Sequence, residues 1–403
     1  MKTDVSKIET NKRLGIGMLG YGTVGKGLET LLEATASNTF FIAKILRRTS
    51  KAHRNDMVED IESLLKDPNV EIVVEVLGGL EPARTYILAA LNAKKAVVTA
   101  NKALINRHGD ELDACAKANG VALRFSAAVG GGIPYLATLL EVKAHTQIQA
   151  IGGILNGTSN FMLDKMEREQ CAFEEALQVA QQLGYAEADP SADIMGTDSL
   201  NKIRLSGVVA FDRWVDFASI PCEGIASLQA EDILFIQNLG YHIRLFATMR
   251  RSEEGIQAYV EPQLFNVEDA EASILANHNI AWYLDQKGER QVLIGQGAGG
   301  IPTAGNILRD LMQIKEKSGG MLPEEHRTLV ANNTKAIHPY LIRSTKTLKS
   351  GYLEALSEVK WIQGEHVYRI TKAMDVSRIH ALIQTLRLTE PIFFAGIQTK
   401  EIV

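Results

Sequence analysis

Short apolar runs alternate with helix-like stretches over the first 145 residues of the chain. The apolar runs predict buried strands at 14–19, 40–46, 70–78, 96–101 and 121–129. Helical patterns lie between several of them, at 23–32, 84–95 and near 108–119. Strands that alternate with helices predict an α/β fold with a parallel, doubly wound sheet. In such a sheet ligands bind beyond the carboxyl ends of the strands.

Helices and strands are no longer interleaved after about residue 147. Helical patterns come first, at 159–169, 172–183, 198–213 and 229–239. Strand-like runs follow, at 241–251, 255–265, 282–286 and 291–296. This order predicts an α+β second domain over about 146–296. A glycine turn at 297–300 then opens a helix, which we expect to return to the first domain (1–145) and complete it to about 320; a simple interdomain connection is the alternative.

The last segment, 337–403, has the pattern strand–helix–strand–strand–helix–strand. This pattern predicts a C-terminal domain with a four-stranded antiparallel sheet, covered on one face by two helices. A module of this kind could sense a small molecule, or it could serve only in dimerisation.

A glycine motif follows the first predicted strand at once. Gly20, Gly22 and Gly25 have the spacing G-x-G-x-x-G, and a helix-compatible stretch begins at Thr23. Between a strand and a helix, such glycines allow a tight turn, close approach of the backbone to a pyrophosphate, and packing of the helix on the strand. The N-terminus of the helix offers free N–H groups to phosphate oxygens. The segment therefore predicts a Rossmann-type dinucleotide-binding domain.

The second predicted strand ends in Arg47 and Arg48. A site that prefers NAD has Asp or Glu near this point, where it bonds the ribose 2′-hydroxyl, whereas arginine suits the 2′-phosphate of NADP. The pattern therefore favours NADP over NAD, with use of both as an alternative. Two solvated arginines at the end of a strand would give the same pattern.

Composition and charge agree with an ordinary cytoplasmic enzyme. The chain has 403 residues and a net charge of −5, which suits two or three domains and provides no basic surface for nucleic acid. No apolar run approaches the roughly 18 residues needed to span a bilayer, and the charged N-terminus has no secretory signal core. The three cysteines form no C-x-x-C pair, which indicates reduced thiols rather than disulfides or a zinc site. We therefore expect a small-molecule substrate, and neither nucleic acid nor a membrane as partner.

An acidic cluster precedes a single lysine in the segment 180–202. Its carboxylates, ahead of Lys202, are Glu187, Asp189, Asp193 and Asp198. The four-residue step from Asp198 to Lys202 puts both side chains on one face of a helix, where they can pair. Carboxylates around one lysine suit a pocket that binds an ammonium-bearing substrate and delivers a proton. A solvated acidic loop before a helix is the alternative.

Two further motifs follow predicted strands. Asn101 and Lys102 come after the strand 96–101, and the sequence GGGIP (130–134) comes after the strand 121–129. Because the carboxyl ends of parallel strands meet at one edge of the sheet, both motifs are expected to face the nicotinamide end of the cofactor. A surface lysine at a strand-to-helix turn is the alternative for Lys102.

Together these motifs resemble the homoserine dehydrogenase family, over roughly residues 12–320. The blocks VTANKAL, GGGIP, GGILNGTSN and GAGGIPTAG occur in the family's order and spacing. The family's active-site signature is filled at every position, by Ala180, Gly184, Asp189, Pro190, Asp193, Gly196, Asp198 and Lys202. The resemblance implies reversible NAD(P)H-dependent reduction of L-aspartate 4-semialdehyde to L-homoserine, in threonine, methionine and isoleucine biosynthesis.

The resemblance also implies roles for individual residues. Lys202 would be the catalytic acid–base, Asp198 its supporting carboxylate, and Lys102 a residue between nicotinamide and substrate. The substrate would be held by Glu187, Asp193, Asn156, Gly157 and Thr158. The cofactor would be bound by Gly20, Gly22, Thr23, Val24, Gly25, Arg47, Lys102 and Gly299.

Two more features follow from the resemblance. A monovalent cation, Na⁺ or K⁺, would be held by the backbone carbonyls of Ser126, Val129, Gly131 and Ile133, with Ser126 at a position where the family usually has Glu. The C-terminal segment resembles an ACT domain in its order of elements, although it lacks the Asp-x-Pro-Gly turn often seen there. A homodimer or higher homo-oligomer is expected.

Two other classes of protein remain open. A semialdehyde dehydrogenase that acts through a thioester needs a cysteine at the mouth of the cofactor site, and no cysteine lies in a glycine-rich or strand-end motif. A non-catalytic NADP-binding amino-acid sensor would have no need of a proton donor such as Lys202.

Overall fold

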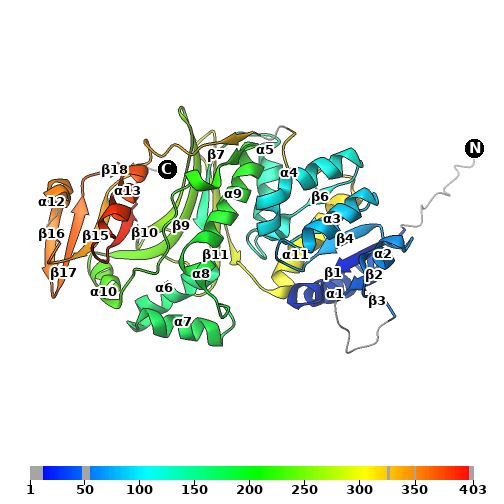
Figure 1. The fold of residues 1–403 in the computed structure, drawn as a ribbon, viewed down its shortest axis with the longest axis horizontal. Helices are drawn as coiled ribbons and strands as arrows, with labels where there is room; N and C mark the ends of the chain where they lie inside the picture. Colours follow the sequence, from blue (N-terminus) through cyan, green and yellow to red (C-terminus); the bar gives the residue numbers. More distant parts are fainter. Residues whose placement is uncertain (1–11, 48–54, 325–326, 349–350, 399–403) are drawn as a thin grey trace, which may run out of the picture. The chain divides into compact units, whose positions relative to one another are not determined.

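The structure is a computed structural model that describes residues 12–47, 55–324, 327–348 and 351–398 (Figure 1). The chain forms two compact units. The first unit comprises Met1–Ala128 and Gly299–Met321, and the second comprises Val129–Ala298 and Leu322–Val403. Among the described residues, no helix combines the length and apolar character that a membrane span requires.

The first unit is built on a parallel six-stranded sheet with the order β3-β2-β1-β4-β5-β6. Its strands are β1 (Leu14–Leu19), β2 (Phe40–Leu46), β3 (Met57–Val58), β4 (Ile72–Glu75), β5 (Ala96–Thr99) and β6 (Leu123–Arg124). The doubly wound sheet predicted from the sequence is confirmed. The strand order reverses between β1 and β4, so the ligand crevice of this unit lies at their carboxyl ends.

Helices flank this sheet and supply one side of its core. They are α1 (Thr23–Thr35), α2 (Ile61–Lys66), α3 (Ala83–Asn92), α4 (Lys102–Ala118) and α11 (Gly300–Lys315). Helix α11 packs along α1, although the two are far apart in sequence. Ile16, Leu28, Val74, Ile307 and Leu311 form part of one buried cluster, which joins both helices to the strands.

Two predicted elements of the first unit differ from the observed ones. Helix α4 begins at Lys102, because the side chain of Asn101 accepts a hydrogen bond from the Leu104 N–H and caps the helix. The strand predicted at 121–129 ends after Arg124. Its continuation turns into a short 3₁₀ helix because the backbone N–H and the hydroxyl of Ser126 both donate to the carboxylate of Asp310, at 2.7 Å.

The second unit is built on a mixed nine-stranded sheet with the order β12-β11-β7-β9-β10-β19-β15-β17-β16. Its strands are β7 (Ile148–Ile154), β9 (Tyr241–Ser252), β10 (Gly255–Asn266), β11 (His278–Asp285), β12 (Arg290–Gln296), β15 (Tyr340–Thr345), β16 (Ser357–Gln363), β17 (His366–Thr371) and β19 (Phe393–Ile397). Only the contact between β10 and β19 is parallel among the pairings of this sheet. Two short pairs complete the unit: β8 (Trp214–Val215) with β13 (Thr328–Leu329), and β14 (Ile337–His338) with β18 (Met374–Asp375).

Helix α9 is the central helix of this unit. It spans Thr197–Phe211, packs against β7, β9 and β10, and is buried along most of its length. The other helices before the long hairpin β9–β10 are α5 (Tyr135–Lys143), α6 (Gly157–Glu169), α7 (Phe173–Gln182), α8 (Ser191–Ile194) and α10 (Ala230–Asn238). The segregation of these helices from the strands that follow agrees with the predicted α+β character.

The C-terminal segment has the predicted order of elements, with α12 (Gly351–Leu356) and α13 (Val376–Leu386) between its strands. Its strands β19, β15, β17 and β16 are mutually antiparallel. Leu353 of α12 and Ile379 of α13 pack in the same core as Tyr340 and Phe394. The prediction of a sheet of its own was wrong, because β19 pairs with β10 and makes one continuous sheet of nine strands.

Candidate active site

The glycine motif forms the turn between β1 and α1. Gly20 has a φ of +97°, which favours glycine. An added Cβ at Gly25 would lie 3.0 Å from the Gly20 carbonyl oxygen and 3.2 Å from the Met18 sulfur, so this position needs glycine for the helix to pack on the strand. Gly22 precedes the first residue of α1, and an added Cβ there would meet open space. This geometry fits a dinucleotide pyrophosphate at the helix N-terminus.

A cavity of about 240 Å³ lies at the carboxyl ends of β2 and β4 in the first unit. It is lined by Leu46, Leu77, Gly78 and Tyr86, among others. Arg47 directly follows β2 and is exposed. The lining also includes Glu59 and Glu81, so the cavity combines apolar and acidic side chains at the sheet edge where a dinucleotide would bind. Arg48 lies outside the described residues.

Lys202 is held by two contacts in the second unit. Its Nζ lies 2.7 Å from Asp198 Oδ2 and donates to the Leu155 carbonyl oxygen at 2.6 Å. The predicted pairing of Asp198 with Lys202 along one helix face is therefore observed. Both residues are more than nine-tenths buried, so this charge-assisted contact is only weakly exposed to solvent. Asp198 also lies in the first turn of α9, where the helix dipole favours a negative charge.

Asn156 joins this pair to a second carboxylate. Its amide nitrogen donates to Asp193 Oδ1 at 2.6 Å and to Asp198 Oδ2 at 2.8 Å. Its amide oxygen accepts from the Ser159 N–H and caps α6. Asn156, Asp193, Asp198 and Lys202 thus form one connected cluster, although 46 positions separate its ends.

The structure does not bring all of the predicted carboxylates to Lys202. Asp189 accepts hydrogen bonds from the Ser191 hydroxyl and, at 3.0 Å, from the Ser191 backbone N–H, and both lower the pKa of the Asp189 carboxyl. Glu187 is exposed. The cluster around Lys202 therefore contains two carboxylates rather than four, with Asp193 attached through Asn156.

The turn after Asn156 is also engaged in the fold. The hydroxyl of Thr158 donates to the Tyr185 carbonyl oxygen at 2.6 Å, which fixes the loop that carries Glu187. Gly157 lies close to another backbone, since an added Cβ would be 2.7 Å from the Asn277 carbonyl oxygen. These contacts define structural roles, and the predicted contacts of Gly157 and Thr158 with substrate stay predictions.

The predicted cation ligands fall into two segments, one in each unit. Ser126 is tied to Asp310 in the first unit, as described above. In the second unit, the Gly132 N–H donates to the Gln296 carbonyl at 2.9 Å, and the Ile133 N–H donates to the Gly130 carbonyl at 2.8 Å. Gly131 has a φ of +53° and lies against the backbone of Gly297. Across the described ranges, no group of three or more His, Cys, Asp or Glu side chains could hold a metal ion.

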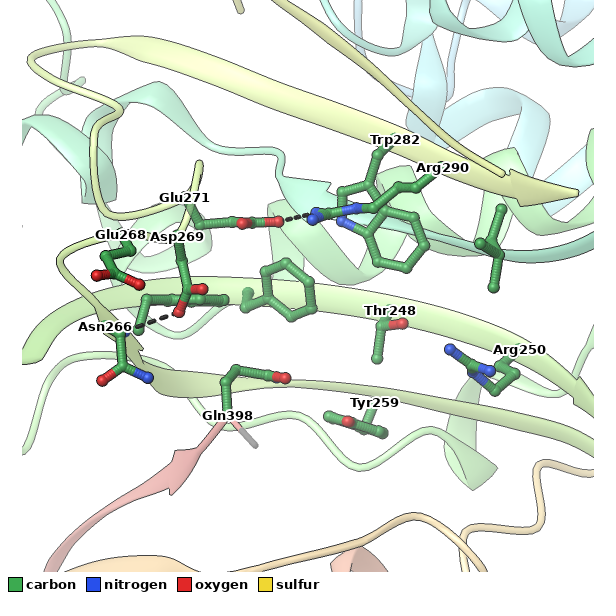
Figure 2. Close-up of a pocket in the computed structure, with 13 residues that line it drawn as sticks. Thr248, Arg250, Tyr259, Asn266, Glu268, Asp269, Glu271, Trp282, Arg290 and Gln398 are labelled. Atoms are coloured by element: carbon green, nitrogen blue, oxygen red, sulfur yellow. Dashed lines mark hydrogen bonds and ion pairs between the residues drawn. The ribbon is translucent and has the colours of Figure 1, made fainter. Parts of the chain in front are cut away.

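A larger cavity, of about 430 Å³, lies over β9, β10 and β11 in the second unit. Figure 2 shows Glu268 and Asp269 at one end of it, Arg250 at the other, and Thr248 between them. Neither Lys202 nor Asp198 lines this cavity, so it is not part of the lysine cluster.

Comparisons with known proteins agree with both halves of this description. Residues 20–126 match the model of the homoserine dehydrogenase NAD-binding domain, and residues 134–312 match the homoserine dehydrogenase model. Homoserine dehydrogenase of Synechocystis is 38% identical over 314 residues, which are 74% of this chain and 72% of that protein. Homoserine dehydrogenase of Bacillus subtilis is 34% identical over 75% of this chain and 73% of that protein.

Solved structures show the same likeness. The homoserine dehydrogenase of Thiobacillus denitrificans superposes with a TM-score of 0.85 at 30% identity and covers 96% of this chain and 98% of that chain. The enzyme of S. aureus gives a TM-score of 0.74 at 27% identity, over 96% and 99% of the two chains.

The dinucleotide-binding sheet and the buried lysine–carboxylate cluster define an oxidoreductase that uses a nicotinamide cofactor and acts on a CH–OH group. The glycine turn and the cavity beside it are consistent with that cofactor. The chain belongs to the homoserine dehydrogenase family. The resemblance found in the sequence is thus confirmed, and the comparisons give no support to a non-catalytic sensor.

Proposed function

We propose that Lys202 is the proton donor and acceptor in the reaction of this family, the reversible conversion of L-aspartate 4-semialdehyde to L-homoserine. The observation that carries the proposal is the buried contact of Lys202 with Asp198 and the Leu155 carbonyl. An ammonium group has three N–H donors, and these two contacts use two of them. The third is therefore available to a substrate oxygen.

In the proposed mechanism the cofactor provides the hydride and Lys202 provides the proton. The bound nicotinamide supplies the hydride for reduction of the aldehyde. As the carbonyl oxygen gains negative charge, Lys202 Nζ stabilises it and donates a proton to it. Asp198 contacts Lys202 Nζ at 2.7 Å and keeps this nitrogen in place for the transfer. In the oxidation of homoserine, the neutral amine takes the proton back from the hydroxyl.

Substrate binding is assigned to the carboxylates around this lysine. Asp193 and the exposed Glu187 would bind the α-ammonium group of the substrate, with the turn 156–158 beside them. Lys102, the first residue of α4, would lie between nicotinamide and substrate. A spectrophotometric assay tests the function directly: wild-type protein should consume NADPH with L-aspartate 4-semialdehyde and should reduce NADP⁺ with L-homoserine. No change in absorbance in either direction would contradict it.

We propose NADP as the preferred cofactor, with Arg47 as the contact to its 2′-phosphate. Arg47→Ala should then weaken NADPH binding by about 10- to 100-fold, because a hydrogen bond to a charged group contributes about 1.5–3 kcal/mol. NADH binding should change little, since NADH lacks this phosphate. Fluorescence titration with both cofactors measures the effect, and Arg107→Ala, at an exposed arginine on α4, is the matched control. Equal weakening of NADPH and NADH by Arg47→Ala would rule out the contact.

Three finer assignments belong to the same proposal. Residues 1–145, completed by about 297–320, would be the cofactor domain, and residues 146–296 would be the substrate-binding and catalytic domain. The carbonyl oxygens of Ser126, Val129, Gly131 and Ile133 would bind Na⁺ or K⁺, because hard cations prefer oxygen ligands. The segment 337–403 would be an ACT-like module, which its order of elements supports.

We also propose a homo-oligomer, which the resemblance to the family implies. A twofold dimer is the commonest closed form of homo-oligomers, so it is the expected state. Sedimentation equilibrium would show a dimer or a multiple of it, and a monomer at micromolar concentration would contradict this assignment.

A further inference from the structure

Glu75 is a carboxylate outside the sequence blocks quoted above for the resemblance. It is the last residue of β4, and its exposed fraction is 0%. Its Oε1 accepts hydrogen bonds from the backbone N–H groups of Leu77 at 2.7 Å and Gly78 at 3.1 Å. Its Oε2 accepts a short hydrogen bond from the hydroxyl of Thr99, at the end of β5. Each of its oxygens is therefore tied to a strand end or loop at the edge of the sheet where the crevice lies.

The network continues from Thr99 to the start of α4. The Thr99 hydroxyl oxygen accepts from the backbone N–H of Asn101 at 3.0 Å. The Asn101 amide nitrogen donates to the Gly79 carbonyl oxygen at 2.6 Å, so the loop after β4 and the loop after β5 are bonded to each other. The same asparagine caps α4, whose first residue is Lys102. The position of Lys102 is thus coupled to Glu75 through the Thr99 hydroxyl and the backbone of Asn101.

The loop that Glu75 orders also borders the glycine turn. Glu75 is paired in register with Leu19, the residue before Gly20. An added Cβ at Gly20 would lie 3.0 Å from the Val76 carbonyl oxygen and 3.2 Å from the Leu77 side chain. A shift of residues 76–78 would therefore change the contacts of Val76 and Leu77 with the glycine turn at Gly20.

A buried carboxylate is an inefficient way to stabilise a sheet. Removal of the group from water costs several kcal/mol, and an apolar side chain in the same place is often as stable or more stable. Burial outweighs the hydrogen bonds from Thr99, Leu77 and Gly78 and raises the pKa of Glu75. Because a buried carboxylate adds little to the stability of the protein, we explain the Glu75 network by its ordering of the loops after β4 and β5.

We propose that Glu75 is a positioning residue for catalysis: its carboxylate fixes the loop that borders the glycine turn and, through Thr99 and Asn101, fixes Lys102 at the start of α4. Since the placement of Lys102 matters to turnover only in the dehydrogenase proposed above, the catalytic part of this role rests on that function. The part that concerns the glycine turn does not, because it predicts an effect on cofactor binding alone.

Glu75→Gln is the test, because it keeps the shape of the side chain and removes its charge. The kcat for homoserine oxidation should fall by about 10- to 100-fold, since a small misplacement of catalytic groups can cost ~10²-fold. The affinity for NADPH, measured by fluorescence titration, should fall as well. The thermal midpoint should stay the same or rise, whereas a residue with a merely structural role would lower it and leave the affinity of the folded protein unchanged.

Variants of Thr99 test the same network in case Glu75→Gln does not fold. Thr99→Val removes the hydroxyl that links Glu75 to Asn101 and should lower kcat in the same direction, and Thr99→Ser should recover most of the loss. The double variant Glu75→Gln/Thr99→Val should lose less than the product of the two single losses, because both changes break one network. Glu71→Gln is the matched control: it lies just before β4, paired with the exposed Lys12, and should behave as wild type.

The outcomes separate this role from the function on which it rests. Wild-type protein that binds NADPH but does not turn over homoserine would refute the dehydrogenase, and the NADPH affinity of Glu75→Gln would still decide the role at the glycine turn. Active wild-type protein with Glu75→Gln within about twofold of it in both kcat and NADPH affinity would overturn the positioning role alone. A loss in Glu75→Gln that is matched by a lower thermal midpoint, with unchanged NADPH affinity, would overturn it too.

Discussion

Lys202→Ala is expected to lower the kcat for homoserine oxidation by about 10²- to 10⁴-fold, the usual contribution of a positioned acid–base group. The variant loses both the proton carrier and the charge next to the developing oxyanion. The affinity for NADPH should change little, because the glycine turn and the cavity beside it belong to the first unit, whereas Lys202 belongs to the second. Steady-state kinetics with homoserine and NADP⁺, together with NADPH titration, measure both quantities.

Two companion variants sharpen this experiment. Lys202→Arg keeps a positive charge but does not give up its proton in proteins, so it separates stabilisation of charge from proton transfer. Lys165→Ala is the matched control, because Lys165 also pairs with a carboxylate four residues along its helix, at Glu169, but on α6. The assignment of Lys202 would be refuted if Lys202→Ala kept turnover within about tenfold of wild type.

Glu261→Gln is expected to lower the free energy of unfolding by about 3–5 kcal/mol at neutral pH, because it disrupts two buried hydrogen bonds to a carboxylate, each of which contributes about 1.5–3 kcal/mol. Glu261 lies on β10 with an exposed fraction of 0%. Its Oε1 is 2.9 Å from His338 Nε2, and its Oε2 is 2.8 Å from His380 Nε2. Glutamine cannot supply the negative charge that both imidazoles face.

The effect of this substitution should depend on pH in a defined direction. Burial by itself raises the pKa of Glu261, but the hydrogen bonds and charges of His338 and His380 outweigh it and lower the pKa from 4.5 to about 2. A carboxyl whose pKa is lower in the folded state than in the unfolded chain stabilises the protein at pH values above the unfolded-state pKa. This contribution is lost as the pH falls from 4.5 towards 2. The difference in free energy of unfolding between wild type and Glu261→Gln should therefore have its full size at pH 7. It should become smaller as the pH falls from 4.5 towards 2.

Urea unfolding at a series of pH values measures this difference. Glu365→Gln, an exposed glutamate in the turn between β16 and β17, is the control and should change stability by no more than about 0.5 kcal/mol. A loss for Glu261→Gln below about 1 kcal/mol, or one that is constant with pH, would contradict the account of the cluster.

Local patterns predicted a large part of the fold and site. The glycine motif, β1 and α1 lie next to one another in sequence, so their residues alone indicated the dinucleotide turn. Asp198 and Lys202 are four residues apart on one helix, so their pairing followed from helical periodicity. Each of these predictions needed only the geometry of a single element.

Other contacts depend on residues that the fold brings together from far apart. Asn156 bonds Asp198 across 42 positions, and local patterns did not predict this contact, although the resemblance named Asn156 as a substrate residue. Glu75 lies inside the predicted apolar run 70–78 and accepts a hydrogen bond from Thr99 on β5, which no periodicity indicates. The strand predicted at 121–129 ended early because of Asp310, 184 residues after Ser126. Long-range hydrogen bonds of this kind leave no local signal.

The parallel contact of β10 with β19 has a consequence for shortening the chain. Truncation before residue 337 would remove the strand that pairs with β10 at Gln263 and Leu264, and would leave backbone groups at that end of β10 without partners. It would also remove His338 and His380, and so leave the buried Glu261 carboxylate without two of its hydrogen-bond partners. A truncated chain of this length would carry an aggregation-prone edge, so the last 67 residues form an integral part of the fold rather than a detachable appendage.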